Sequence, residues 1–310
     1  MTKEDSINLK SHNSNINYQV SNIPPLIVVV GETASGKTSA AIEIAKLIDG
    51  EIICADSRTI YKGMDIGTAK PNKEEQSGIR HHIIDVVEPG QKFNVSDFKT
   101  IAEKCIQDIS LRGKISIIVG GTGLYIDSVL YNYQFLDKAD TVLREQLEQM
   151  SDEQLTTILN NKSIDTTNLN TKNRRHVIRA IETNGKKPAK ENLRENTIVL
   201  GLKLDKDVLK DRILKRVERM FIDGYLKEVE QLSKKFGWDS EAMSGIGYKA
   251  AKEYFCGNAS LEDVKKALVK RDIGLAKRQR TWFKRSNDIL WFEQPEQLVD
   301  RAIKFVNRPK

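Results

Sequence analysis

The chain is 310 residues long, 39% hydrophobic and 30% charged, with a formal net charge of +7 and three cysteines. That length and composition predict a globular protein with one large core or two modest ones, and exclude a disulfide-stapled chain. No apolar stretch reaches the length of a membrane span, which excludes a membrane protein, and residues 1–22 lack the apolar segment of a signal peptide. We therefore expect a cytoplasmic protein with a flexible tail over residues 1–25. The cysteines expected to be reduced and buried are Cys54, Cys105 and Cys256.

An apolar run, residues 26–30, is followed by G-E-T-A-S-G-K-T at residues 31–38 and then by an amphipathic pattern. A buried strand, a glycine-rich turn and a helix form the context of a phosphate-binding loop, in which successive backbone N–H groups point at a polyphosphate. Lys37 adds a positive charge, and the hydroxyl of Thr38 is a ligand for Mg²⁺, the expected cofactor. The loop predicts a diphosphate or a triphosphate without distinguishing the two. The expected diphosphate-binding residues are Gly31, Thr33, Ala34, Ser35, Gly36, Lys37 and Thr38.

Short β-branched runs alternate with helical patterns over the first 130 residues or so. After the run at 26–30, the predicted strands are residues 51–55, 82–87, 115–119 and 197–204. Continuous apolar runs of this kind indicate a parallel sheet covered by helices on both faces. We therefore predict an α/β fold with a core like that of the P-loop NTPases.

The pattern changes after residue 136. Residues 137–190 contain no strand-like run, and their apolar residues recur at helical spacing. We predict a mostly helical insertion over residues 137–190, between two parts of a catalytic core, residues 26–136 and 191–310. In the second part we expect a helix over residues 205–235 that breaks at Gly224.

Polar residues follow two of the predicted strands. Asp56 follows the second strand, and Gly-Gly-Thr at residues 120–122 follows the fourth. Because ligands bind at the carboxyl ends of parallel strands, these residues and the phosphate-binding loop should meet at one crevice. A P-loop ATPase normally has an aspartate for Mg²⁺ at such a strand end, and none follows the fourth strand. Asp85 lies within the third run, and we interpret it as a structural carboxylate.

Positive charge is concentrated in two segments, residues 172–190 and 265–285. The net charge alone favours a polyanionic partner only in general terms. One basic cluster could be a solvated helix face, but two of them beside a phosphate-binding loop favour a nucleic-acid partner.

Several longer motifs carry a family resemblance. Residues 56–71 read D-S-R-T-I-Y-K-G-M-D-I-G-T-A-K-P, residues 120–125 read G-G-T-G-L-Y, residues 246–249 read I-G-Y-K and residues 277–283 read K-R-Q-R-T-W-F. Together with the phosphate-binding loop, these motifs resemble the tRNA dimethylallyltransferase family, in its bacterial form, over nearly the whole chain from residue 26. The resemblance implies transfer of a dimethylallyl group from dimethylallyl diphosphate to N6 of adenine-37, on the 3′ side of the tRNA anticodon.

The residues already singled out fit this chemistry. The exocyclic amine of adenine is a poor nucleophile and must lose a proton as the new bond forms, so Asp56 is the expected general base. The phosphate-binding loop, with Lys37 and with Mg²⁺ on Thr38, would hold the diphosphate and stabilise the charge that it gains on leaving. The resemblance adds Thr122, which matches a family threonine that contacts the target nucleotide. The expected catalytic residues are therefore Asp56, Thr122 and Lys37.

The resemblance also implies the contacts with RNA. The expected partners are the tRNA anticodon stem-loop and dimethylallyl diphosphate, with no membrane and no obligate protein partner, and we expect a monomer. Trp282 and Phe283 are interpreted as core residues rather than stacking platforms. The expected tRNA-binding residues are Asp56, Ser57, Arg58, Thr59, Thr122, Arg144, Arg175, His176, Arg179, Lys249, Lys277, Arg278 and Gln279.

Three residues depart from the family pattern. Glu32 stands where proline is usual, Thr59 where glutamine is frequent, and His176 where an arginine of the insertion is usual. Glu32 would place a carboxylate near the bound phosphate unless its side chain points away. None of the three replaces a residue of the expected catalytic set.

Three other functions stay open at this stage. An adenylate isopentenyltransferase would share the phosphate-binding loop and the aspartate, but it prenylates free AMP-type nucleotides and needs neither basic segment. A small-molecule P-loop kinase would bind ATP and would need the strand-end aspartate that is missing. A non-catalytic RNA-binding protein would have no reason to keep Lys37, Thr38, Asp56 and Thr122 together. The product that forms from dimethylallyl diphosphate and either tRNA or AMP distinguishes these functions.

Overall fold

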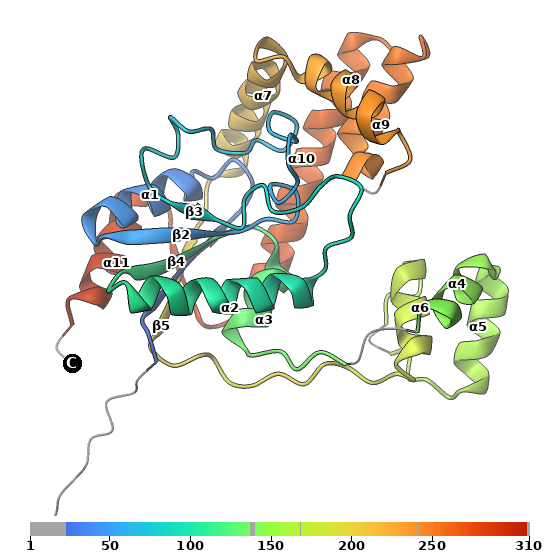
Figure 1. The fold of residues 1–310 in the computed structure, drawn as a ribbon, viewed down its shortest axis with the longest axis horizontal. Coiled ribbons are helices and arrows are strands. Elements are labelled where there is room, and N and C mark those ends of the chain that lie inside the picture. The colour runs from blue at the N-terminus through green and yellow to red at the C-terminus, as the bar shows by residue number, and fades with distance from the viewer. Residues whose placement is uncertain (1–22, 137–139, 168, 241, 309–310) are drawn as a thin grey trace, which may run out of the picture.

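The computed structural model describes residues 23–136, 140–167, 169–240 and 242–308, so most of the predicted flexible tail lies outside the described part. The described chain is built on a six-stranded parallel sheet with the strand order β3-β2-β4-β1-β5-β6 (Figure 1). The strands are β1 (Leu26–Gly31), β2 (Gly50–Ala55), β3 (His81–His82), β4 (Ile115–Gly120), β5 (Thr197–Leu202) and β6 (Ile289–Phe292). This parallel sheet with its helices confirms the predicted α/β class.

Alternate residues of each strand point to opposite faces of the sheet, and helices cover both faces, so both are buried. On one side, Ile27 and Val29 of β1 pack against α1 and α11. On the other side, Val28 and Val30 pack in a cluster with α2, α3 and α10. Burial on both faces explains why the strands read as continuous apolar runs. These helices are α1 (Lys37–Leu47), α2 (Val95–Leu111), α3 (Gly123–Leu130), α10 (Leu261–Phe283) and α11 (Pro295–Val306).

The strand register brings three loops to one edge of the sheet. Val30 of β1 and Ala55 of β2 both pair with Gly120 of β4. A side chain at Gly120 would place its Cβ 2.1 Å from the carbonyl oxygen of Ala55, so this close pairing requires glycine. The phosphate-binding loop, Asp56 and the Gly-Gly-Thr segment therefore leave the sheet side by side.

Helices from the second half of the chain cover this edge. A helix breaks at Gly224, which has φ +99°, as the sequence predicts. The α10 helix begins with a capping box, in which Ser260 and Asp263 each accept a hydrogen bond from the other's backbone N–H. The elements here are α7 (Lys206–Ile222), α8 (Tyr225–Phe236), η1 (Ala242–Ser244) and α9 (Ile246–Phe255).

Helices α4 (Thr141–Gln149), α5 (Asp152–Asn161) and α6 (Arg174–Glu182) form a separate group. Figure 1 shows this group beside the sheet domain, joined to it by two extended segments that run side by side. An antiparallel bridge between Gln134 and Ala189 links the two segments. The group has its own apolar cluster, which includes Leu147, Leu155, Leu159, Val177, Ile178 and Ile181. Residues 137–139 of the predicted insertion lie outside the described residues.

The predicted strand at residues 82–87 is wrong beyond its first residue. β3 ends at His82, and the next residues turn away, with positive φ at Ile83 (60°) and Asp85 (55°). The Asp85 carboxylate accepts a hydrogen bond from the buried ammonium of Lys70, which also binds the carbonyl of Tyr61 at 2.7 Å. These tertiary contacts favour a turn over continued pairing, so Asp85 has the structural role expected of it.

Two further observations differ from the sequence analysis. The sequence analysis predicted no structure for residues 289–306, where β6 and α11 complete one edge and one face of the sheet. Of the three cysteines, Cys54 is buried as expected, whereas Cys256 is exposed just after the end of α9.

No helix among the described residues combines the length and apolar character needed to cross a membrane.

Candidate active site

A cavity of about 380 Å³ lies at the carboxyl edge of the sheet, between the strand ends and helices α7, α9 and α10. It brings together many of the residues predicted for the site from distant parts of the chain. Those lining it are Thr33, Asp56, Ser57, Arg58, Thr122, Arg278 and Gln279. Lining residues that the sequence analysis did not single out include Thr68, Arg216, Tyr248, Arg271 and Asp272.

The phosphate-binding loop has the backbone shape that its sequence predicts. Ala34 and Gly36 have φ of 62° and 95°, and α1 begins at Lys37. A side chain at Gly31 would place its Cβ 2.7 Å from the carbonyl oxygen of Leu202. The hydroxyl of Ser35 is buried and has no hydrogen-bond partner among the described residues. A buried hydroxyl without a partner is costly, so Ser35 is available to a ligand.

Lys37 is held at the centre of this loop. Its ammonium donates a hydrogen bond to the carbonyl oxygen of Glu32 at 3.1 Å. Burial lowers the pKa of Lys37 to about 8, an effect that the neighbouring carboxylate of Asp56 opposes and the guanidinium of Arg216 adds to. A half-buried cation beside the backbone N–H groups of this loop is stabilised when a diphosphate binds.

Asp56 and Thr122 lie together at the ends of β2 and β4. The Asp56 carboxylate accepts a hydrogen bond from the backbone N–H of Arg58 at 2.8 Å. The Thr122 hydroxyl accepts one from the backbone N–H of Ser57 at 3.0 Å, and the Thr122 N–H donates to the carbonyl of Ala55 at 3.1 Å. These bonds fix the carboxylate and the hydroxyl on adjacent backbone segments that both line the cavity.

Gln279 of α10 connects the two halves of the site. Its side-chain carbonyl accepts a hydrogen bond from the backbone N–H of Thr33 at 2.7 Å, and its NH₂ group donates to the carbonyl of Gly121 at 3.2 Å. Only 6% of Gln279 is exposed. The amide predicted to contact tRNA is thus directed at the protein's own backbone, where it fixes the spacing between the phosphate-binding loop and the Gly-Gly-Thr segment.

Two arginines of α7 reach the same loop and were missed by the sequence analysis. Arg216 donates from Nη1 to the hydroxyl of Thr33 at 2.9 Å and pairs through Nη2 with Asp272. Its Nε is buried and has no hydrogen-bond partner in the described part of the chain. Arg212 donates from Nη1 to the carbonyl of Ser35 at 3.1 Å. Their spacing of one helical turn was visible in the sequence, but nothing local says which way that face points.

The comparisons with known proteins agree with this geometry. A family model described as IPP transferase matches residues 59–286. A tRNA dimethylallyltransferase from Acetivibrio thermocellus is 45% identical over 296 residues, which cover 90% of this chain and 94% of the relative. The corresponding Bacillus subtilis protein is 40% identical over 295 residues, with the same shares covered. This chain belongs to the tRNA dimethylallyltransferase family. It is therefore a transferase of the prenyltransferase type.

Solved structures of the family have the same fold. A tRNA isopentenylpyrophosphate transferase from Staphylococcus epidermidis is 36% identical, with a TM-score of 0.69, and 92% of this chain and 99% of that chain are covered. A eukaryotic dimethylallyltransferase, described as acting on tRNA, is 28% identical with a TM-score of 0.80, and 92% of this chain and 80% of that chain are covered.

The family's long motif at residues 56–71 forms a loop that is anchored from α8. Glu228 is buried, and its carboxylate accepts three hydrogen bonds from backbone N–H groups, those of Asp65 at 2.8 Å, Ile66 at 2.6 Å and Gly67 at 2.9 Å. Burial raises the pKa of Glu228, and the three N–H donors oppose that shift. Glu228, like the two arginines of α7, was not predicted from the sequence, because its partners lie in another segment.

Helix α6 carries three of the predicted RNA-binding residues. Arg175 and His176 are exposed. Arg179 pairs with the buried carboxylate of Glu182, which also accepts a bidentate pair from Arg144 of α4 at 2.6 and 2.8 Å. Arg144 therefore links α4 to α6 through Glu182, whereas the pair between Arg179 and Glu182 lies within α6.

The remaining predicted residues lie as follows. Lys249, Lys277 and Arg278 are exposed, whereas Thr59 is buried and its hydroxyl has no hydrogen-bond partner among the described residues. Phe283 is buried and Trp282 packs beside it, which agrees with their interpretation as core residues. Glu32 is buried too, and its carboxylate pairs with Arg280 of α10.

Proposed function

We propose that the protein transfers a dimethylallyl group from dimethylallyl diphosphate to N6 of adenine-37 in tRNA. The observation that carries this proposal is one cavity lined by Thr33 of the phosphate-binding loop together with a carboxylate and a hydroxyl, those of Asp56 and Thr122. Such a cavity can hold a diphosphate leaving group at one end and a nucleobase at the other. The exposed cations of α6 and α10 supply a surface for the RNA backbone.

The reaction needs a proton acceptor at the nucleobase end. The N6 amine attacks the allylic carbon, the bond from that carbon to the diphosphate oxygen breaks, and N6 loses one proton. The carboxylate of Asp56 takes this proton as general base. Thr122, fixed through its own hydrogen bonds, holds the base in position without adding charge. To reach the cavity the adenine must leave its stack in the anticodon loop.

At the other end the protein binds the leaving group. The backbone N–H groups of the phosphate-binding loop, the ammonium of Lys37 and the unpaired Nε of Arg216 supply positive charge where the diphosphate becomes more negative. The unpaired Ser35 hydroxyl and the half-buried Thr38 fit a Mg²⁺–diphosphate complex, with the Thr38 hydroxyl as the protein's ligand. When bound, Mg²⁺ would neutralise charge on the departing diphosphate.

The direct test incubates the full chain and Mg²⁺ with radiolabelled dimethylallyl diphosphate and either unmodified tRNA or AMP. Label in tRNA alone, at the adenine next to the anticodon, is the expected result. Label in AMP would instead make the protein an adenylate prenyltransferase. Label in neither substrate would contradict the proposed reaction, provided that an active relative, used as the positive control, labels tRNA in the same assay.

Binding of the donor is expected to depend on pH through Lys37. Because its pKa in the free protein is about 8, Lys37 loses its charge as the pH rises from 7 to 9. The charged fraction of a group with a pKa of about 8 falls by about tenfold between pH 7 and 9, so affinity for dimethylallyl diphosphate should fall by up to about tenfold over this range. Calorimetry in the absence of tRNA measures this affinity at each pH. Lys37→Arg keeps its charge and should bind with a flat profile; an equally steep profile in that variant would assign the titration elsewhere.

Arg175→Glu is expected to weaken tRNA binding and to make it less dependent on salt. Arg175 is exposed and forms no ion pair with the described residues, so the substitution leaves the packing of α6 intact. Loss of one phosphate contact should reduce the slope of log K against log salt by about 0.7–0.9. Filter binding between 50 and 200 mM salt, roughly the range in which such slopes are measured, gives the value. Lys162→Glu, just after the end of α5, is the matched control. An unchanged slope for Arg175→Glu would remove this residue from the RNA surface.

A further inference from the structure

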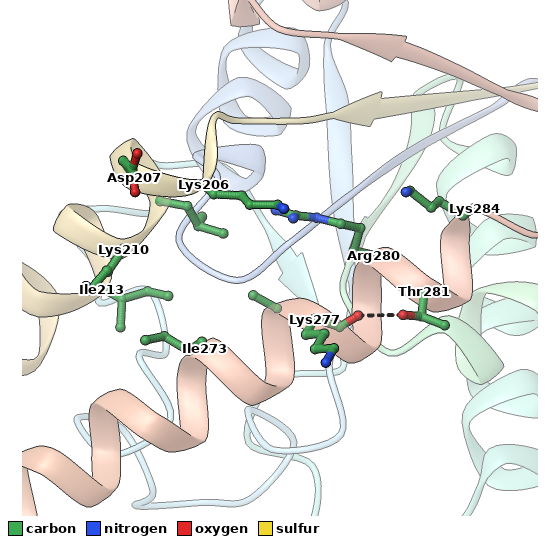
Figure 2. A pocket seen from close by; sticks show the side chains of 11 residues that line it. Lys206, Asp207, Lys210, Ile213, Ile273, Lys277, Arg280, Thr281 and Lys284 are labelled. Atoms are coloured by element: carbon green, nitrogen blue, oxygen red, sulfur yellow. Dashed lines mark hydrogen bonds between the residues drawn. The ribbon is translucent and has the colours of Figure 1, made fainter.

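A second cavity lies between α7 and α10, on the side away from the candidate active site. Its volume is about 550 Å³. The floor is aliphatic, formed by Leu209 and Ile213 of α7 and Ala276 of α10, all at most 4% exposed. Figure 2 shows Ile213 and Ile273 facing each other across this groove. The groove therefore has an aliphatic floor, with the partly exposed side chain of Ile273 at its edge.

The rim of the groove is strongly basic. Lys206 and Lys210 of α7 and Lys277 and Lys284 of α10 are exposed, and none of them forms an ion pair with the described residues. The carboxylate on the rim belongs to Asp207. Four unpaired ammonium groups around an aliphatic floor match a ligand with an anionic head and an apolar tail.

The groove is distinct from the candidate active site, and no residue lines both cavities. On α10, Asp272, Leu275 and Gln279 line the active-site cavity, which places them on one face of the helix by their spacing of three and four residues. Residues 273, 276, 277, 280, 281 and 284 line the groove from the other side.

Arg280 connects the groove to the phosphate-binding loop. Its guanidinium lines the groove, and Figure 2 shows it extending from α10 towards the first turn of α7. Nε and Nη2 pair with the buried carboxylate of Glu32, whereas Nη1 has no hydrogen bond to the described residues. Ala34 of the same loop packs against the groove floor. An anion in the groove would compete with Glu32 for Arg280.

We infer that the groove binds a prenyl diphosphate longer than the five-carbon donor, and that this ligand weakens donor binding by drawing Arg280 away from Glu32. The diphosphate would lie among the lysines and Arg280, and the hydrocarbon tail on the aliphatic floor. The first part is independent of the proposed reaction, whereas the effect on the donor rests on the proposed function. Glu32 would then be the residue through which the phosphate-binding loop responds to a ligand in the groove.

An RNA strand fits the groove less well than a small amphiphile. RNA recognition uses phosphate contacts and stacking on aromatic or guanidinium planes, and the floor here offers only aliphatic side chains. The groove also lies on the face of α10 opposite to the cavity that would receive the nucleobase. A tail of two or three isoprene units can cover that floor, which a phosphodiester backbone cannot.

Calorimetry with geranyl diphosphate tests the binding step on the full chain, with Mg²⁺ and saturating dimethylallyl diphosphate and without tRNA. Binding should persist under these conditions and weaken by about tenfold in Lys206→Glu/Lys210→Glu, because two attractive charges at the rim become repulsive. Lys104→Glu/Lys227→Glu, two exposed lysines outside the groove, should bind like the parent chain. Ile273→Ser, at the edge of the floor, should weaken binding of geranyl diphosphate but not of inorganic diphosphate.

Several outcomes would overturn the inference. Loss of geranyl diphosphate binding when the donor is saturating would assign it to the phosphate-binding loop. Equal affinity for inorganic diphosphate would remove the role of the floor. A larger loss of tRNA affinity in Lys206→Glu/Lys210→Glu than in the control pair would assign the groove to RNA. These measurements do not depend on turnover, so they stay informative if the proposed reaction fails.

The link to the loop has its own test in Glu32→Gln. In the parent chain, geranyl diphosphate should raise the dissociation constant of dimethylallyl diphosphate several-fold. Glu32→Gln removes the carboxylate that competes for Arg280, so this variant should still bind geranyl diphosphate while the effect on the donor disappears. An undiminished effect in Glu32→Gln would contradict coupling through this ion pair.

Discussion

Replacing Asp56 by alanine is expected to lower the turnover of dimethylallyl transfer by about a hundred- to ten-thousandfold, the range for loss of a general base. The other carboxylate that lines the cavity, that of Asp272, is paired with Arg216 and Arg271, so the N6 proton would lose its acceptor. Affinity for tRNA should change little, because one carboxylate contributes little to a surface that binds phosphates through cations. Single-turnover rates at saturating substrates, with filter binding of tRNA in parallel, separate the two quantities.

Asp56→Asn separates the chemical role from the structural one. The asparagine side-chain oxygen can still accept the hydrogen bond from the backbone N–H of Arg58, so the turn after β2 is preserved. An amide cannot take a proton at neutral pH, so this variant should be as slow as Asp56→Ala. A variant with asparagine that turns over within about tenfold of the parent would show that Asp56 only shapes the turn.

The parts of the fold that were predicted correctly are those whose signal is local. β1, β2 and β4 are continuous apolar runs followed by polar or glycine residues, and the parallel-sheet rule alone brings Asp56 and Thr122 to the same edge. The run at residues 82–87 has the same local pattern, but it does not form the predicted strand beyond His82. There the contacts of Lys70 with Tyr61 and Asp85 decide the backbone path, and these come from tertiary structure.

The contacts that complete the site could not be predicted, because the residues that form them are far apart in the chain. Gln279 binds the backbone of Thr33 across 246 residues, and Arg216 binds the hydroxyl of the same threonine across 183. A glutamine or arginine on a polar helix looks the same whether it faces solvent or a loop. The same ambiguity made Gln279 a predicted RNA contact, although the structure directs its amide to the two loops that it spaces.

The ion pair between Glu32 and Arg280 explains how the protein accommodates a residue that departs from the family pattern. The sequence alone indicates only that a carboxylate at this position would repel the bound phosphate. In the fold the carboxylate is turned away from the loop's interior and neutralised by α10. Consecutive residues of α10, Gln279 and Arg280, thus hold consecutive residues of the loop, Thr33 and Glu32.

Glu228→Ala is expected to lower the free energy of unfolding by about 3–5 kcal/mol, since removal of a buried partner leaves polar groups unsatisfied at about 1–3 kcal/mol each. Three backbone N–H groups, those of Asp65, Ile66 and Gly67, would lose their acceptor at once. These residues belong to the loop that begins at Asp56. Donor-dependent turnover should therefore fall as well, even in conditions where the variant is folded.

Urea unfolding gives the stability change, and amide hydrogen exchange at residues 65–67 locates it. Glu230→Ala is the matched control, because this glutamate lies on the same helix but forms only an exposed ion pair with Lys234. Such pairs contribute about 0–1 kcal/mol, so the control should unfold almost like the parent chain. Equal stability losses in the two variants would mean that α8 tolerates neither substitution for reasons unrelated to the loop. Faster exchange at residues 65–67 in Glu228→Ala alone would instead establish that this one carboxylate holds the family's longest motif against the sheet.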